Sequence, residues 1–230
     1  LHSFPTRRSS DLEMGSPRLG RHRAGRSADR ASGGRVPILV LATGNPGKVR
    51  ECAAFLAPAG YEVLGLSALS DATPVEETGR TFEENARLKA EEYSRRTSHL
   101  VLAEDSGLEV DALLGEPGVM SARYGGPGLA DQDRCAAILQ ALSATPDEKR
   151  AARFRSVFAV AKDGRTLATF EGAVQGTILR EQRGSRGFGY DPIFFHPPSG
   201  RSFAELSLEE KQAVSHRGIA LRKLGDTPLF

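Results

Sequence analysis

An apolar run that leads directly into a glycine- and proline-containing turn and a helical segment constrains the fold of this 230-residue chain most. Ile38–Ala42 is continuously apolar, which is typical of a strand buried on both faces. The turn Thr43-Gly-Asn-Pro-Gly-Lys48 follows, and a helix is predicted over 49–57. Buried strands that alternate with helices indicate an α/β fold.

The rest of the chain extends this pattern and then changes it. Two capping boxes, Thr81-Phe-Glu-Glu84 and Ser207-Leu-Glu-Glu210, predict helix starts, and Asp163-Gly164 predicts a hairpin turn. Further helices are predicted over 81–96, 131–142 and 207–224, and further strands over 61–66, 99–103, 154–162, 165–171 and 172–180. We therefore expect a mixed β-sheet flanked by helices, with residues 110–185 forming a lobe across a cleft.

The basic charge of the chain is concentrated at its beginning. Residues 1–37 hold eight Arg against three acidic residues, a net charge of +5, so that residues 38–230 carry −3 of the total +2. His2–Leu12 resembles the translation of a sequencing adapter, and we interpret residues 1–36 as a disordered basic tail that is not native. A transit peptide and a basic arm that binds nucleic acid are the alternatives.

Cysteine usage and hydropathy argue against a disulfide-stapled protein and against a membrane-spanning one. Cys52 and Cys135 lack partners at metal-ligand spacing and are interpreted as reduced core residues. No apolar run approaches the roughly 20 residues of a membrane-spanning helix. We expect a cytoplasmic protein with no membrane and no stable nucleic-acid partner.

The turn Thr43–Lys48 has the composition of a phosphate-binding loop. Its two glycines permit close approach of the backbone, exposed N–H groups at the helix start favour an anion, and Lys48 adds charge. It is not a Walker A loop, and an ordinary strand-to-helix turn is the alternative. Asn85 and Lys89 lie one turn apart and present either a phosphate-facing or a solvated helical face.

Glu104-Asp-Ser-Gly107 brings two carboxylates to the end of the predicted strand 99–103, where α/β folds usually bind ligands. Adjacent residues of a strand face opposite sides, so Glu104 and Asp105 need not enter one site. Carboxylates suit Mg2+ and can accept a proton from water. Glu77 is the candidate second metal ligand, with Glu76 or a solvated acidic loop as alternatives.

Two later phrases have the chemistry of a purine site. Gly187-Phe-Gly-Tyr-Asp-Pro192 offers aromatic faces, which stack on bases for ~1–3 kcal/mol each, although burial in the core is the commoner role. Ser215-His-Arg-Gly218 and Lys211 lie on the predicted helix 207–224. Arg and Lys carry only donors, so they favour a 6-oxo purine over the amino group of adenine. Stabilisation of the helix dipole is the alternative explanation.

These four phrases, in this order, resemble the inosine triphosphate pyrophosphatase (dITP/XTP pyrophosphatase) family from about Ile38 onward. The resemblance implies that residues 37–230 form a single two-lobed α/β domain with an active-site cleft between the lobes, and a homodimer. It implies Mg2+-dependent hydrolysis of deaminated purine nucleoside triphosphates to the monophosphate and pyrophosphate. The family often has Asp where this chain has Glu104, which leaves the role of Glu104 open.

The resemblance gives Asp105 the catalytic role and, with Glu77, the metal-binding role. The residues expected to bind substrate are Thr43, Gly44, Asn45, Pro46, Gly47, Lys48, Ser106, Phe188, Gly189, Tyr190, Asp191, Lys211, His216 and Arg217. A related pyrophosphatase for other modified nucleotides, a nucleotide-binding regulator without catalysis and an RNA-binding protein led by the basic tail are the alternative functions.

Overall fold

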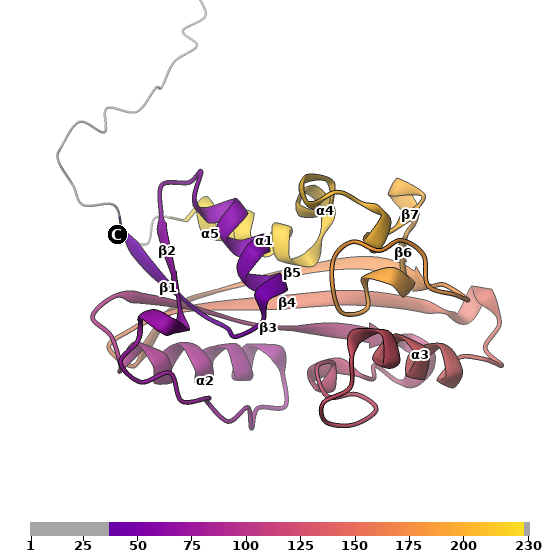
Figure 1. Ribbon diagram of the computed structural model, residues 1–230, viewed down its shortest axis with the longest axis horizontal. Coiled ribbons are helices and arrows are strands. Elements are labelled where there is room, and N and C mark those ends of the chain that lie inside the picture. The colour runs from indigo at the N-terminus through magenta and orange to yellow at the C-terminus, as the bar shows by residue number, and fades with distance from the viewer. Residues whose placement is uncertain (1–36, 228–230) are drawn as a thin grey trace, which may run out of the picture. The chain divides into compact units, whose positions relative to one another are not determined.

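The computed structural model describes residues 37–227, and the predicted tail 1–36 lies outside the described residues. Seven strands of this part form one mixed sheet in the order β2-β1-β3-β4-β5-β6-β7 (Figure 1). The strands are β1 (Ile38–Ala42), β2 (Glu62–Gly65), β3 (Leu100–Val110), β4 (Ala151–Lys162), β5 (Arg165–Ile178), β6 (Phe194–His196) and β7 (Arg201–Ser202). The helices are α1 (Pro46–Leu56), α2 (Phe82–Ser94), α3 (Asp131–Ala141), α4 (Leu208–Val214) and α5 (His216–Gly225).

The pairing of the strands confirms the predicted mixed sheet and α/β class. β1 is parallel to both β2 and β3, because α1 and α2 carry the chain back between them. Every pair from β3 to β7 is antiparallel. The predicted hairpin at Asp163-Gly164 is the turn between β4 and β5.

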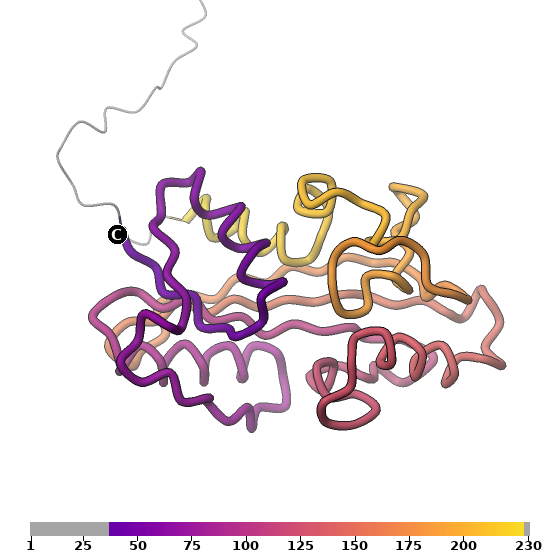
Figure 2. The backbone as a smooth tube through the Cα atoms, viewed as in Figure 1, coloured from indigo at the N-terminus to yellow at the C-terminus, as the bar shows by residue number. Residues whose placement is uncertain are grey.

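The helices cover opposite faces of the sheet. Leu39 and Leu41 point to the face that packs on Cys52 and Leu56 of α1 and on Leu221 of α5. The alternate residues of β1 point to the other face, where α2 packs. Figure 2 shows α1 and α5 side by side although they come from opposite ends of the chain, and Arg217 of α5 donates to Glu51 of α1. The neighbouring helices bring the phrases Thr43–Lys48 and Ser215–Gly218 together.

β3 is longer than predicted, because it does not end before Glu104. It continues to Val110 paired with β4, while β1 ends at Ala42 opposite Ala103 and Glu109 forms an isolated bridge with Pro117. The sequence suggested a loop because Glu, Asp, Ser and Gly have low strand propensity. The ladder with β4 overrides that local preference.

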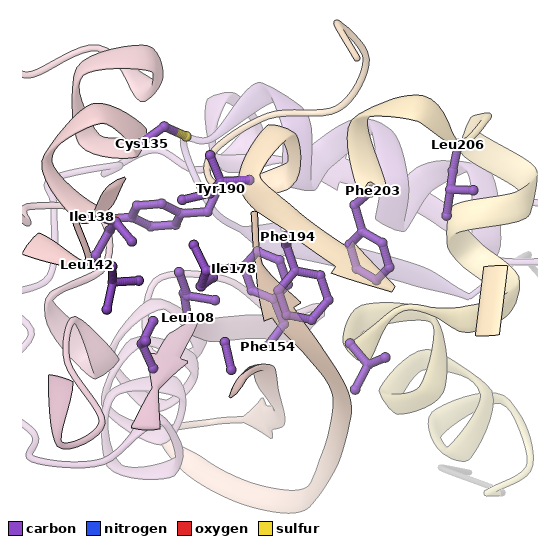
Figure 3. Close-up of a cluster of buried hydrophobic side chains, with 14 residues drawn as sticks. Leu108, Cys135, Ile138, Leu142, Phe154, Ile178, Tyr190, Phe194, Phe203 and Leu206 are labelled. Carbon is purple, nitrogen blue, oxygen red and sulfur yellow. The ribbon is translucent and has the colours of Figure 1, made fainter. Parts of the chain in front are cut away.

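The predicted strands 165–171 and 172–180 are one strand, β5, whose residues alternate between buried and exposed from Phe170 to Gly176. Residues 110–185 therefore share the main sheet with the rest of the unit. Along β3–β5 the core divides, with one cluster at the β6 end built from Leu108, Phe154 and Phe194 (Figure 3). α3 contributes Ile138 and Leu142 to this cluster.

The predicted helix 207–224 is wrong, because the structure has two helices that meet at Ser215. Ser215 has an extended backbone (ψ 157°) and is at once the C-cap of α4 and the N-cap of α5. Its hydroxyl accepts from the N–H of Gly218 at 3.1 Å. Serine competes in this way with helix continuation. His216 and Arg217 consequently lie at a helix start, where the helix dipole does not stabilise cations.

Cys52 and Cys135 are both free and buried, as predicted. None of the helices within 37–227 combines the length and apolarity required to span a bilayer.

Candidate active site

One cavity of about 320 Å3 lies where β1 ends, and it collects residues from all four sequence phrases. This volume is within the range of small-molecule sites. Its wall includes these predicted residues: Thr43, Gly44, Asn45, Lys48, Glu77, Asp105, Ser106, Phe188, Gly189, Tyr190, Asp191, Lys211, His216 and Arg217. Pro46, Gly47 and Glu76 are not part of this wall.

The early end of β1 explains why neighbouring carboxylates reach one cavity. Beyond Ala42 no residue of β1 pairs with this edge of β3. The cavity therefore reaches the strand at Glu104 and at Asp105. As predicted, the two side chains point to opposite faces: Glu104 contacts Arg217 of α5, and Asp105 contacts Asn85 of α2. The cavity extends around this free edge and meets both.

The start of α1 differs from the expected phosphate loop. Asn45 is the N-cap, and its Oδ1 accepts from the N–H groups of Gly47 (2.9 Å) and Lys48 (3.2 Å). The prediction that the first N–H groups of this helix are exposed is therefore wrong for these two. The positive charge of Lys48 and the helix dipole remain as attractions for an anion.

Lys48 lies in the wall between the two carboxylates of β3. Its Nζ is 3.7 Å from Oε2 of Glu104. Burial lowers the pKa of Lys48, and the neighbouring cations Lys89 and Arg217 lower it further against the opposing effect of Glu104. Lys48 and Lys89 are cations of this wall that a phosphate could contact, and carboxylates stand beside them.

Asn85 and Lys89 of α2 share a face directed at Asp105. Asn85 Nδ2 donates to Asp105 Oδ2 at 3.1 Å, and Lys89 Nζ is 3.6 Å from Asp105 Oδ1. The same ammonium donates to Glu77 Oε1 at 2.6 Å. Burial raises the pKa of Asp105, although Lys89 and Lys48 oppose the shift. Asn85 and Lys89 are both buried, so the solvated face is wrong; Lys89 lines the cavity and Asn85 holds Asp105, and a phosphate-facing role for the pair stays a prediction.

The carboxylates of Asp105 and Glu77 fit a divalent cation that arrives with a substrate. Both already converge on one positive group, the Lys89 ammonium. Among residues 37–227 no group of three or more His, Cys, Asp or Glu side chains is arranged for a metal ion. Mg2+ is usually held by one or two carboxylates together with water and substrate phosphates, so two suffice.

A buried network of charges forms the other end of the cavity. Arg217 Nε donates to both carboxylate oxygens of Glu104, at 3.0 and 3.1 Å, and its Nη1 donates to Glu51. Lys211 Nζ donates to Glu51 Oε1 at 2.8 Å and to Asp191 Oδ2 at 2.5 Å. Three carboxylates and two cations from five elements are thereby linked.

Glu104 belongs to this network and not to the Asp105 side. Burial acts to raise its pKa, but Arg217 and Lys48 outweigh that effect and lower the pKa of Glu104. The Ser156 hydroxyl donates to Glu104 Oε1 at 2.7 Å and satisfies it further. Its role, left open by the sequence, is to hold Arg217 in place.

Glu51 was missed by the sequence analysis, although it links both cations of the network. The helix α1 buries Gly47, Glu51, Cys52 and Leu56. A carboxylate on the buried face of an amphipathic helix is a recognisable sequence signal, since charged residues are rarely buried without a partner.

The aromatic and imidazole rings have different roles. Phe188 is partly buried, and Lys211 Nζ and Arg217 Cζ lie 4.8 and 5.3 Å from its ring centroid. Tyr190 belongs to the core beside Cys135 and Ile138 (Figure 3), and its hydroxyl donates to the Ser121 carbonyl at 2.8 Å. For Tyr190 the core alternative therefore describes the packing best.

His216 is a neutral buried base in the cavity wall. Burial, reinforced by Arg217, lowers its pKa well below the usual value. Its ring stacks on Phe154 at 4.8 Å between centroids, and Nδ1 has no hydrogen-bond partner among the described residues. A neutral imidazole offers one donor and one acceptor.

Known proteins resemble the chain in both sequence and structure. The Ham1 family model matches residues 39–227. A dITP/XTP pyrophosphatase of Geobacillus kaustophilus is 51% identical over 82% of this chain and 92% of its own length. A dITP/XTP pyrophosphatase of Desulforamulus reducens is 49% identical over 80% of this chain and 92% of its own length.

Solved structures agree with the sequence relatives. A HAM1 protein from Coxiella burnetii superposes with a TM-score of 0.74 at 41% identity, covering 82% of this chain and 96% of that one. The Ham1 protein of Staphylococcus aureus gives a TM-score of 0.72 at 41% identity with the same coverage. The matched family region contains all four phrases and every residue of the cavity wall. The chain therefore belongs to the Ham1 family.

Proposed function

We propose that this protein is a nucleoside triphosphate pyrophosphatase that hydrolyses dITP, ITP and XTP to the monophosphate and pyrophosphate, and so removes deaminated purines from the nucleotide pool. One observation supports the proposal: a single cavity has cations and carboxylates at one end, and the Phe188 ring with polar side chains at the other. The names of the relatives, dITP/XTP pyrophosphatases, support the same activity.

The triphosphate would occupy the end near Lys48 and Lys89, whose charges offset those of the phosphates. Asp105 and Glu77 would hold Mg2+, which when bound polarises phosphoryl oxygens and neutralises developing charge. Asp105 is the proposed catalytic residue, because its carboxylate is open to the cavity and positioned by Asn85 to accept a proton from the attacking water.

The base would lie against Phe188, within reach of donors left over by the charge network. Lys211 has three ammonium protons, and its bonds to Glu51 and Asp191 use two of them among the described residues. The third can donate to a 6-oxo group. An adenine amino group there would face a donor and lose its own partner, which disfavours dATP.

We further propose Mg2+ dependence, a homodimer and a cytoplasmic location, each expected from the family resemblance. Sedimentation equilibrium tests the dimer by giving a mass of twice the chain. Fractionation of cells tests the location. A monomer at micromolar concentration would remove the dimer from the proposal and leave the chemistry in place.

The activity is tested by following dITP hydrolysis with 31P NMR, with and without Mg2+. We expect pyrophosphate and dIMP, and no orthophosphate, only when Mg2+ is present. The variant Asp105→Asn keeps the size of the side chain and should reduce kcat by at least about 100-fold, as expected for loss of proton transfer and charge. Release of orthophosphate, or full activity of this variant, would contradict the proposal.

A further inference from the structure

The Phe188 ring is only partly enclosed by neighbouring side chains. It borders the site cavity and also a second cavity of about 230 Å3, whose wall includes Arg50 and Arg186. On α1 it lies directly against Gly47, where an added Cβ would be 2.4 Å from a ring carbon. Because open space adjoins the ring in two directions, the position of the ring depends on the backbone that carries it.

That backbone has no regular secondary structure to fix it. Residues 179–190 connect β5 to the 3-10 turn Asp191–Ile193 without helix or strand. Gly187 and Gly189, on either side of Phe188, have φ of 74° and 61°. Glycines lose more conformational entropy on ordering than other residues, so a segment of this kind needs external hydrogen bonds.

The N–H groups of Arg183 and Arg186 donate to backbone carbonyls, and Cys135 Sγ donates to the Gly189 carbonyl at 3.4 Å. Two carboxylates accept from the N–H groups next to the ring. The N–H of Phe188 donates at 2.9 Å to Oδ2 of Asp191, the first residue of the 3-10 turn that follows the segment. The N–H of Gly189 donates to Asp131 Oδ2 at 2.6 Å, and Asp131 is the first residue of α3. Hydrogen bonds to an ionised acceptor are stronger than neutral ones. Asp131 therefore fastens the segment to a separate helix.

Arg134 orients the Asp131 carboxylate. Its Nη2 pairs with Oδ1 of Asp131, and its Nη1 donates to the carbonyl oxygen of Leu129. The second oxygen of Asp131 thus remains directed at Gly189. α3 is itself anchored in the core through Cys135 and Ile138, so the bond connects the segment to a fixed element.

We propose that Asp131 is a positioning residue for base recognition: through the Gly189 N–H it fixes Phe188 as the stacking surface opposite the donors Lys211 and Arg217. This inference rests on the proposed function, since stacking matters only if a purine nucleotide binds. Without Asp131 the segment must be ordered when the substrate binds, which weakens binding of the base and leaves the chemistry at the phosphates unchanged.

The test compares Asp131→Ala, Asp131→Asn and Asp133→Ala with the unsubstituted protein. Asp133 is the matched control, an exposed carboxylate on the same helix turn whose side chain has no partner within the described chain. The readouts are amide hydrogen exchange of Gly189 by NMR, kcat and KM for dITP, and the inhibition constant of inorganic tripolyphosphate, which has no base.

For Asp131→Ala we expect Gly189 exchange to accelerate and KM for dITP to rise, each about 10-fold, as for loss of a charged hydrogen bond. kcat and the tripolyphosphate constant should stay within about twofold, because neither depends on stacking. Asp131→Asn keeps an acceptor oxygen and should restore most of both losses, and Asp133→Ala should match the unsubstituted protein.

Unchanged Gly189 exchange or unchanged KM in Asp131→Ala would overturn the inference. An equal rise in KM for dITP and in the tripolyphosphate constant would do so too, because it would indicate general damage. If the unsubstituted protein did not hydrolyse dITP, the proposed function would fail instead. Exchange at Gly189 and calorimetric binding of dITP to the variants would then decide the positioning role separately.

Discussion

At the scale of single residues, the adjacent carboxylates Glu104 and Asp105 have separate tasks. Glu104 pairs with Arg217 and Lys48, whereas Asp105 contacts Asn85 and Lys89. A buried cation such as Arg217 is costly unless it is paired and hydrogen-bonded, and Glu104 meets that requirement. The division explains how one short phrase of β3 contributes to both ends of the cavity.

Residues from several sequence motifs meet in the structure, although their roles stay predictions. Lys48, Asp105, Lys211 and Arg217 were all expected in one site, and all four line one cavity. Glu51 could not be assigned, because its importance comes from contacts with residues about 160 positions away in the chain. Local spacing carries no information about such pairs.

His216 predicts a specific dependence of stability on pH. Burial lowers the pKa of His216 well below 6.5 in the folded protein, whereas in the unfolded chain the residue keeps its ordinary pKa near 6.5. The unfolded state therefore binds an additional proton below about pH 6.5, and the free energy of unfolding contributed by this residue falls as pH falls, by up to about 1.4 kcal/mol per pH unit.

Urea denaturation between pH 5 and 8 measures this effect as a difference. His216→Asn cannot titrate, so its free energy of unfolding should decrease less below pH 6.5 than that of the unsubstituted protein. Groups distant from this position titrate alike in both proteins and cancel in the comparison. Parallel curves for the two proteins would contradict this prediction, because they would show that the pKa of His216 is the same in the folded and unfolded protein.

At the scale of elements, chain pairing and caps overrode local sequence preference. β3 continues through Glu104–Gly107 because β4 supplies a complete ladder, although these residues are poor strand formers. The helix predicted over 207–224 is divided because Ser215 ends α4 and caps the start of α5. Both differences move site residues, since they set the direction of Asp105 and of His216.

The close approach of α5 to β5 makes a second element-scale prediction. A Cβ on Gly172 of β5 would lie 2.1 Å from the His216 carbonyl oxygen and 2.7 Å from the Ala220 nitrogen. Gly172→Ala must therefore displace the start of α5. We expect the free energy of unfolding to fall by about 1–3 kcal/mol, the usual cost of overpacking, with a higher KM for dITP because His216 and Arg217 move.

A strand glycine with free space provides the control for this substitution. Gly65 ends β2, and a Cβ there would have its nearest neighbour 4.0 Å away, at Ser67. Gly65→Ala should change stability by less than about 0.5 kcal/mol. Equal stability of the two variants would show that the approach of α5 to β5 adjusts without cost. Chemical denaturation of both proteins under the same conditions measures the difference.

At the scale of the whole described unit, long strands make one site from two packed halves. β3, β4 and β5 extend from the cores under α1, α2 and α5 to the core at α3 and β6. The cavity lies between these clusters and receives residues from both. The sequence predicted the α/β class and the mixed sheet. It could not predict that the short β1 leaves an edge of β3 open, because strand lengths depend on pairing.

The central claim is that the cavity selects 6-oxo purine nucleoside triphosphates, and kcat/KM for dITP and dATP, measured with Mg2+, tests it most directly. Lys211, Arg217 and His216 line the cavity, and their proposed contact with the base predicts a kcat/KM at least about 100-fold higher for dITP, since a mismatched buried donor remains unpaired. XTP should resemble dITP. Equal values for dITP and dATP would contradict the account, because the buried network would then not read the base.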